Sequence, residues 1–362
     1  MRTGIGDLTE VSLAIIGDGQ TAGGAFIASP NFPTYRYCWY RDGTFVAQAL
    51  DLFGDHDRAA AFYDWGARTV LRQRDVVQKV LLGPAHERPS VYLHTRYELD
   101  GSPADDDWPN FQLDGYGTFL WGMTEHLRLS GRGLRPGWGQ AIEVLLEYLG
   151  HLWKSPNYDC WEELPDRIHL STLCALYGGA AAVASRLNVP GAADLAQATR
   201  DFVLAQSAEL GYLPKFVGSD AVDASVMWAS IPFNLFELSD PVMTSTARKI
   251  EDDLVGPSGG VRRYASDSFY GGGEWILLTA LLGECWLRSG ETERAAGARV
   301  WIEAHAGPRG ELPEQAPVDL IAPAEYDLWQ TRWGPIATPL LWSHAAYLRL
   351  AHALRQHGAD AS

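Results

Sequence analysis

Residues 158–165 read Tyr158-Asp159-Cys160-Trp161-Glu162-Glu163-Leu164-Pro165, and a long apolar pattern begins directly after them. Two adjacent carboxylates follow a tryptophan, and the proline marks the end of the loop. Such a segment can hold a carboxylic acid against an indole near the start of a helix, and surroundings of low polarity raise the pKa of a carboxyl group. We therefore interpret this loop as the carrier of a general acid.

Helical patterns extend outward from this loop toward both ends of the chain. Apolar residues recur at spacings of three and four, as at Ala60, Tyr63, Ala67 and Val70, which is the period of an amphipathic helix. No stretch has the alternation typical of a strand. We predict about twelve helices on this basis. They cover residues 6–16, 44–53, 57–74, 114–129, 138–152, 167–187, 192–210, 225–238, 241–254, 275–287, 292–306 and 340–355.

Short and long connections alternate between the predicted helices. The stretches 76–111 and 307–338 are longer than a connector in a compact domain needs, so we expect functional loops there. Helical hairpins closed into a ring would bring such loops to one end. The sequence thus predicts an all-α protein with the (α/α)6 barrel fold, a toroid of six helical hairpins, as a single catalytic domain over residues 1–362. An irregular helical bundle or solenoid is the alternative.

Charge and cysteine usage limit the classes of partner. The formal net charge is −16 over 362 residues, without a run of lysine and arginine, whereas nucleic acids and anionic membranes bind basic surfaces. The four cysteines are scattered and form no CxxC pair, so we expect neither a metal nor another cofactor. The N-terminus lacks the apolar core of a signal peptide, and we find no apolar run of membrane-spanning length, so we expect a cytoplasmic protein.

Many aromatic residues lie in the predicted loops beside charged groups. A sugar ring has apolar C–H faces and polar edges, so loop tryptophans next to carboxylates and arginines favour a carbohydrate pocket. Structural roles stay open for each group alone. Arg41 and Asp42 could form an ordinary ion pair at a helix start, Glu162 and Glu163 could be helix-start acids, and Glu314 could be a solvated loop carboxylate.

Six motifs follow one another along these loops. They are Tyr35-x-x-x-Trp39-x-Arg41-Asp42; Trp108-x-x-x-Gln112-x-Asp114-Gly115; residues 158–163; Arg263-Tyr264 followed by Gly271 and Trp275; Glu314-Gln315; and Trp342-Ser343-His344-Ala345-Ala346. Together, over nearly the whole chain, they resemble the motifs of the glucoamylase family, glycoside hydrolase family 15. Cys160 stands where that family usually has leucine. The resemblance implies the (α/α)6 barrel fold.

The resemblance also implies a role for each matching residue. Glu162 is expected to be the general acid that protonates the glycosidic oxygen, and Glu314 the general base that activates water. Tyr35 is expected to position that water. The residues implied to bind substrate are Trp39, Arg41, Asp42, Trp108, Trp161, Glu163, Arg263 and Trp342, with Glu163 nearest to the second sugar.

Members of the family are exo-acting α-glucoside hydrolases that invert the anomeric centre and release β-glucose from the non-reducing end. Inversion needs room for a water molecule, so we expect the carboxyl groups of Glu162 and Glu314 to be about 6.5–9.5 Å apart. We see no N-terminal β-sandwich and no starch-binding module in the sequence, so we expect small substrates, such as isomaltose (α-1,6) or maltose (α-1,4). The linkage and the oligomeric state stay open.

Rival functions fit the same scaffold. A trehalase is the nearest alternative, and a catalytically silent sugar-binding protein is another. An all-α lyase or cyclase is disfavoured because no aspartate-rich metal motif lies in a predicted helix. Sugar release from trehalose, compared with release from isomaltose and maltose, would separate the two hydrolases.

Overall fold

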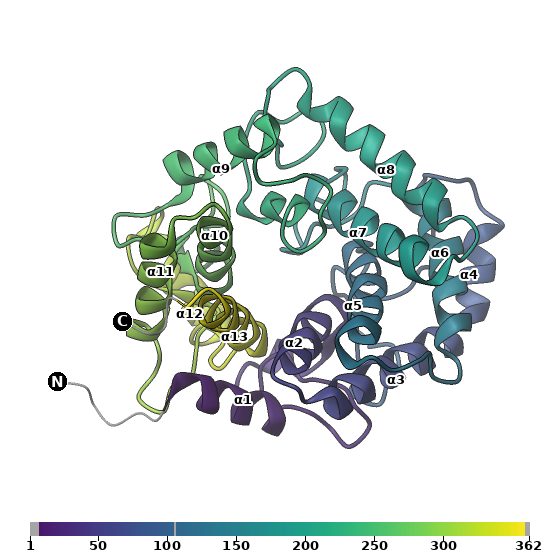
Figure 1. The fold of residues 1–362 in the computed structure, drawn as a ribbon, viewed down its shortest axis with the longest axis horizontal. Helices are drawn as coiled ribbons and strands as arrows, with labels where there is room; N and C mark the ends of the chain where they lie inside the picture. Colours follow the sequence, from purple (N-terminus) through teal and green to yellow (C-terminus); the bar gives the residue numbers. More distant parts are fainter. Residues whose placement is uncertain (1–6, 105, 359–362) are drawn as a thin grey trace.

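The computed structural model describes residues 7–104 and 106–358, whose helices form a closed ring with an inner and an outer layer (Figure 1). The chain alternates between the layers, so that an inner segment follows each outer helix. The inner layer consists of α2 (Tyr40–Leu52), α5 (Asp114–Ser130), α7 (Leu170–Leu187), the 3₁₀ helix η2 (Ala224–Ala229), α10 (Ile276–Arg288) and α13 (Leu341–Gln356). The outer layer consists of α1 (Leu8–Asp18), α3 (His56–Arg72), α6 (Trp138–Leu152), α8 (Ala192–Ser207), α9 (Pro241–Leu254) and α11 (Thr292–Ala304).

Burial differs between the layers as this arrangement requires. The inner helices α2 and α10 each bury 12 of their 13 residues, because neighbours surround them. The outer helix α9 buries one stripe at helical spacing, made of Met243, Thr246, Ile250 and Leu254. Its start is also well specified, since Pro241 occupies the first turn after the cap Asp240. The predicted (α/α)6 barrel is therefore confirmed.

The predicted helix over residues 225–238 is wrong. The structure has the short η2 there, followed by turns, and its inner position is completed by irregular chain. Pro232 explains the difference, because proline lacks the N–H that a helix needs and its ring clashes with the preceding turn.

Two further helices lie where irregular chain is predicted. These are α4 (Arg74–Leu81), which buries only Val77 and Val80, and α12 (Pro323–Trp333), which buries no side chain. Helix α12 has no apolar stripe that could reveal it, whereas in α4 the apolar residues Val76, Val77, Val80 and Leu81 recur at helical spacing and could have predicted the helix. The four strands found among residues 7–104 and 106–358 have two residues each and are also too short to show an alternation. They pair as β1 (Cys38–Trp39) with β2 (Arg96–Tyr97), and β3 (Glu274–Trp275) with β4 (Gln315–Ala316).

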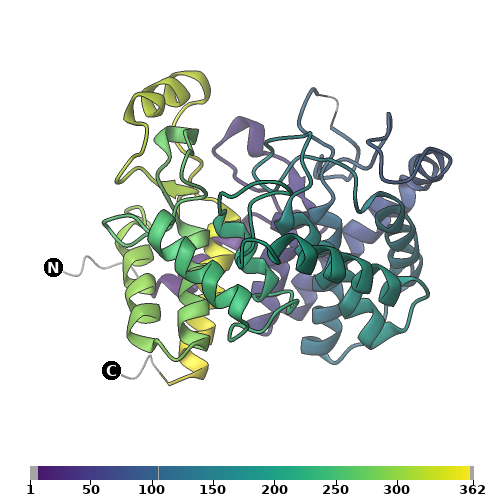
Figure 2. The same ribbon diagram turned by 90° about the horizontal axis from the view of Figure 1, so that it is seen from above.

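The long connections gather at one end of the ring (Figure 2). The inner α2, α5 and α13 begin at this end, so their partly positive N-termini favour carboxylates near them. Below it, aromatic rings from different inner segments close the centre of the ring. Phe45 of α2 stacks on Trp342 of α13 with centroids 5.4 Å apart, and lies 5.8 Å from the ring of Trp228 in η2.

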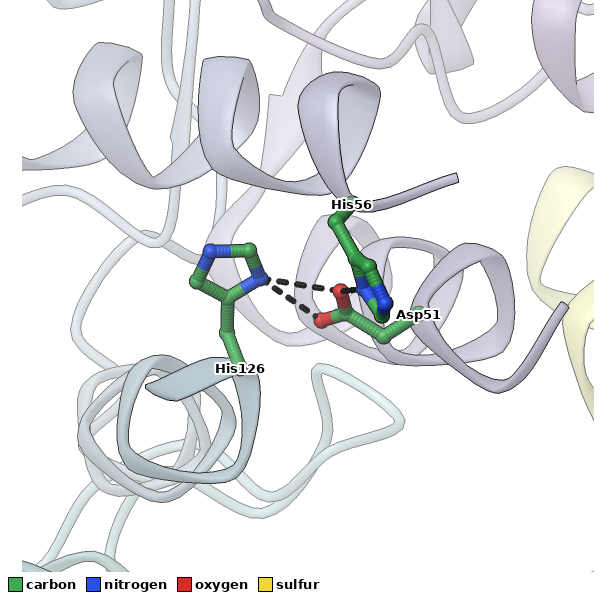
Figure 3. A group of neighbouring side chains, drawn as sticks. All are labelled: Asp51, His56 and His126. Atoms are coloured by element: carbon green, nitrogen blue, oxygen red, sulfur yellow. Dashed lines mark hydrogen bonds and ion pairs between the residues drawn. The ribbon is translucent and has the colours of Figure 1, made fainter. Parts of the chain in front are cut away.

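A polar cluster joins three helices at the opposite end of α2 (Figure 3). We call it the Asp51 cluster, after the carboxylate that accepts from Nδ1 of His56 at 2.8 Å and from Nδ1 of His126 at 2.9 Å. The three groups lie within 4.8 Å of one another, a spacing that metal ligands also have. Hydrogen bonds alone satisfy the carboxylate and both Nδ1 atoms, and we interpret the cluster as a tie between α2, α3 and α5.

The inner helix α7 is apolar and long enough to cross a membrane by length and composition alone. The expectation that no run of this kind exists is therefore too strict. In the structure 61% of the helix is buried, and it packs between α5 and α8 as a core helix does.

Candidate active site

A pocket of about 460 Å³ opens at the loop end of the ring. Its volume lies in the range of small-ligand sites, about 300–1,000 Å³. All eleven predicted site residues line it: Tyr35, Trp39, Arg41, Asp42, Trp108, Trp161, Glu162, Glu163, Arg263, Glu314 and Trp342. The fold thus brings together side chains from both ends of the sequence.

Glu162 is held by two donors that leave one of its oxygens available. Its Oε1 accepts from Nε1 of Trp39 at 2.7 Å and from Nε2 of Gln112 at 3.1 Å. No hydrogen bond from another described residue reaches its Oε2, and Glu162 lines the pocket. Glu162 also has a left-handed φ of 66°, a conformation that costs a non-glycine residue about 1–3 kcal/mol unless its surroundings impose it.

Asp159 imposes that conformation from within the loop. Its Oδ1 accepts from the backbone N–H of Trp161 at 3.0 Å and of Glu163 at 2.9 Å, the residues on either side of Glu162. The backbone N–H of Glu162 in turn donates to the carbonyl of Asp159 at 2.9 Å. The side chain of Asp159 therefore fixes the backbone that aims the proposed acid.

A buried lysine holds Asp159 in place. Nζ of Lys215 lies 3.2 Å from Oδ2 of Asp159 and 2.6 Å from Oδ2 of Asp223. Asp223 in turn accepts from the indole of Trp161 at 3.0 Å. Burial alone would raise the pKa of Asp223, but the charge of the Lys215 ammonium and the hydrogen bonds from Lys215 and Ser225 together lower that pKa overall. We call Asp159, Lys215 and Asp223 the lysine clamp.

Glu314 also lines the pocket, with 4% of its surface exposed. Its backbone N–H donates to the carbonyl of Ala337 at 2.9 Å, and β4 begins at the next residue. The hydroxyl of Tyr35 donates to its Oε1 at 3.0 Å. Burial raises the pKa of Glu314 to about 8, against the opposing effects of Tyr35 and Arg263.

Two aromatic rings connect the carboxylates. Tyr35 holds Glu314, Trp39 holds Glu162, and the two rings meet edge to face with centroids 5.6 Å apart. Each acid is therefore held by its own aromatic partner at the wall of one pocket. The separation of about 6.5–9.5 Å that inversion requires stays a prediction.

Arg41 and Asp42 lie on the first turn of α2, although the sequence predicts them in the preceding loop. Nη1 of Arg41 donates to Gln112 at 2.9 Å and to Asp114 at 3.0 Å, while its Nε is 3.3 Å from the carboxylate of Asp42. Burial raises the pKa of Asp42 to about 6, and the negative charge of Glu162 adds to the effect of burial. A bound hydroxyl group would thus meet a fixed cation and a fixed carboxyl group.

Arg263 organises the next part of the wall. Its guanidinium makes a bidentate ion pair with Asp267 at 2.7 and 2.6 Å, and its Nη2 also donates to Glu163 at 3.1 Å. The hydroxyl of Tyr264 donates to the other oxygen of Glu163 at 2.5 Å. Glu163 is therefore held in a fixed position at the pocket surface.

Tryptophans form the apolar faces of the pocket. Trp108 meets Trp39 edge to face at 6.2 Å, and the guanidinium of Arg96 lies 3.6 Å over the ring of Trp108. Trp161 packs against Trp275 at 5.1 Å. These contacts fix the orientation of the rings before a ligand arrives.

Sequence reasoning missed two groups. Trp329, Arg332 and Trp333 line the pocket from α12, and their grouping of aromatic and basic residues within a predicted loop could have revealed them. Lys215 and Asp223 hold the acid loop from distant segments, and no local signal points to them.

Paired carboxylates in a pocket walled by tryptophans define the site of a glycoside hydrolase. Comparison with known proteins agrees, since residues 12–302 match the family described as glycosyl hydrolases family 15. The chain belongs to that family. Glu314 lies beyond the matched residues, so the family match does not extend to the proposed base.

Relatives extend the similarity to nearly the whole chain. The chain is 41% identical to an isomaltose glucohydrolase of Kribbella flavida over 358 residues, which covers 96% of this chain and 92% of the relative. A glycosidase variant in complex with glucose has a TM-score of 0.91 at 40% identity, with 96% of both chains covered. A trehalase of Thermoplasma acidophilum is 22% identical over 267 residues, and the match spans 68% of this chain and 44% of the trehalase.

Proposed function

We propose that the protein is an inverting, exo-acting α-glucoside hydrolase that releases β-glucose from the non-reducing end of small α-linked gluco-oligosaccharides. The observation that supports it most is that Glu162 and Glu314 line one pocket and are held by different partners. The similarity to the isomaltose glucohydrolase favours α-1,6 linkages, as in isomaltose. Maltose, with its α-1,4 linkage, is the other expected substrate.

In this reaction Glu314 takes a proton from a water molecule whose oxygen attacks the anomeric carbon. Glu162 gives its proton to the glycosidic oxygen while the bond between that oxygen and the anomeric carbon breaks, and the electron pair stays on the leaving oxygen. Attack from the face opposite the leaving group converts the α configuration to β. Tyr35, whose hydroxyl contacts Glu314, positions the water.

The remaining pocket residues bind the sugar and stabilise charge. Arg41, Asp42 and Arg263 hold the hydroxyl groups of the terminal glucose, which favours one orientation of the ring. Trp39 fixes the acid through its indole and also walls the pocket. The free Oε2 of Glu162 is the oxygen that carries the transferred proton.

Single substitutions test these roles. Glu162→Gln and Glu314→Gln should each lower kcat about 10²–10⁴-fold and change KM far less, because proton transfer occurs only in the transition state. Asp107→Asn is a matched control, since Asp107 is an exposed carboxylate that lines the same pocket without a role in the reaction. Unchanged turnover in either glutamate variant would refute the assignment.

A trehalase is the second candidate, because a trehalase of Thermoplasma acidophilum is similar to part of this chain. Isomaltose, maltose and trehalose present the same terminal glucose with different leaving sugars. We expect glucose release to be fastest from isomaltose. Faster release from trehalose would favour the trehalase, and binding without release would favour a silent sugar-binding protein.

A further inference from the structure

Helix α12 lies beyond the two layers of the ring, at the end where the long connections gather (Figure 2), and the pocket opens at that end. None of its residues is buried, yet three of them, Trp329, Arg332 and Trp333, line the pocket. The helix packs against a small aromatic cluster beside the pocket and adds no fully buried side chain to the two main cores of the barrel. Its placement over the pocket therefore calls for a role in ligand binding.

A small aromatic cluster seats α12 on η3 (Phe269–Gly271). The ring of Trp329 meets Phe269 edge to face at 4.9 Å and lies 6.1 Å from Tyr270. The hydroxyl of Tyr270 donates to the carbonyl of Gly334 at 2.9 Å, directly after the helix. Because Phe269 itself lines the pocket, this seat holds one face of α12 toward the ligand.

Arg332 is the polar group that α12 presents. Among the described residues, Arg332 has no hydrogen bond or ion pair, and its guanidinium lies 5.2 Å from the ring of Trp333. Its donors are consequently available to a ligand. An arginine flanked by indoles offers hydrogen bonds to sugar hydroxyls and flat faces to the C–H surface of the ring.

Depth separates α12 from the groups that hold the terminal glucose. Arg41, Arg263 and Glu314 are buried at 4%, 2% and 4% exposure, whereas Arg332 and Trp333 are exposed. An exo-acting enzyme takes the terminal sugar into the deep part of its pocket, and the sugar that leaves stays near the opening. The rim residues therefore face the leaving sugar.

We propose that α12 forms a wall of the subsite for the leaving sugar, with Arg332 donating to its hydroxyls and Trp333 stacking against it. This inference rests on the proposed function and deepens it. The contacts of α12 select among glycosidic linkages, because the linkage sets how the leaving sugar meets a fixed wall. The buried groups recognise the terminal glucose, which all such substrates share.

Two substrates with the same glucosyl group test the proposal. Isomaltose has a leaving sugar, whereas α-glucosyl fluoride has a fluoride ion in its place. Arg332→Ala should lower kcat/KM for isomaltose about 10–100-fold, the value of a charge-assisted hydrogen bond, and leave kcat/KM for α-glucosyl fluoride within about 2-fold. Trp333→Ala should show the same difference between the substrates.

Leu328→Ala is the matched control, because Leu328 lies on the same helix, is 61% exposed and does not line the pocket. Leu328→Ala should leave kcat/KM unchanged for both substrates. The proposal would be overturned if the Arg332 and Trp333 variants lost kcat/KM equally for both substrates, or lost it for neither. Inactivity of the unaltered enzyme on both substrates would overturn the proposed function itself, so the two failures are distinguishable.

Discussion

Replacing Lys215 with methionine should lower both the free energy of unfolding and kcat, because the lysine clamp supports the loop that carries Glu162. The ammonium lies 2.6 Å from Asp223 and 3.2 Å from Asp159, and the three side chains are 6%, 2% and 3% exposed. Methionine keeps most of the volume and removes the charge. Two buried carboxylates then lie close together without a cation, and breaking a buried ion pair in this way costs about 3–5 kcal/mol.

The loss of stability should depend on pH in a defined direction. The pKa of Asp223 is lower in the folded protein than in the unfolded chain. Ionised Asp223 therefore stabilises the folded protein fully above the unfolded-state pKa, and this stabilisation is lost as the pH falls through the folded-state pKa. In the variant the same carboxylate lacks its cation and gains protons more readily. The difference in the free energy of unfolding between the two proteins should therefore be largest near neutral pH and shrink toward about pH 4.

Urea denaturation at several pH values, together with kcat for isomaltose, measures both effects. Lys249→Met is the matched control, because the ion pair of Lys249 with Asp253 is on the surface, at 31% and 39% exposure, and should contribute at most about 1 kcal/mol. The variant Lys215→Met/Asp223→Asn should recover part of the stability, since it removes both charges. A Lys215→Met protein with the urea midpoint and kcat of the Lys249→Met protein would refute this reasoning.

Three further outcomes follow from the site. Tyr35→Phe removes the hydrogen bond that favours ionised Glu314, so the pH at which kcat/KM rises should increase by about 1–2 units. A pH profile of kcat/KM measures this shift, and a profile that rises at the original pH would contradict the prediction. Arg263→Lys should lower kcat/KM about 10²-fold, because an ammonium cannot replace the planar guanidinium that binds both Asp267 and Glu163. A kcat/KM within about 3-fold of the original value, a difference of about 0.7 kcal/mol, would count against this. Treatment with EDTA should leave the melting temperature unchanged, since hydrogen bonds satisfy the Asp51 cluster. A clear fall in the melting temperature would indicate a metal ion in that cluster.

The fold and the pocket could be predicted where the signal is local in the sequence. Outer helices such as α9 show a regular apolar stripe, and the motifs around Trp39, Glu162 and Glu314 lie on loops between recognisable helices. Because inner and outer helices alternate, loops of one type must gather at one end. The eleven predicted residues therefore meet in one pocket.

Other features have no local signal. Lys215 and Asp159 are distant in sequence, and their contact depends on how two loops fold over the start of α7. Helix α12 buries none of its side chains, so it has no stripe for a periodicity argument to detect. The start of α2 is hidden because Arg41 and Asp42, which are polar, are buried inside the ring.

Proton NMR of the glucose released from isomaltose tests the central claim most directly. The claim is that Glu162 and Glu314 act on opposite faces of the sugar, so the attacking water must invert the anomeric carbon. In the first minutes, before mutarotation, the signal of the β-anomer should grow ahead of that of the α-anomer. Initial growth of the α-anomer would contradict the account, because it would require retention and a different role for Glu314.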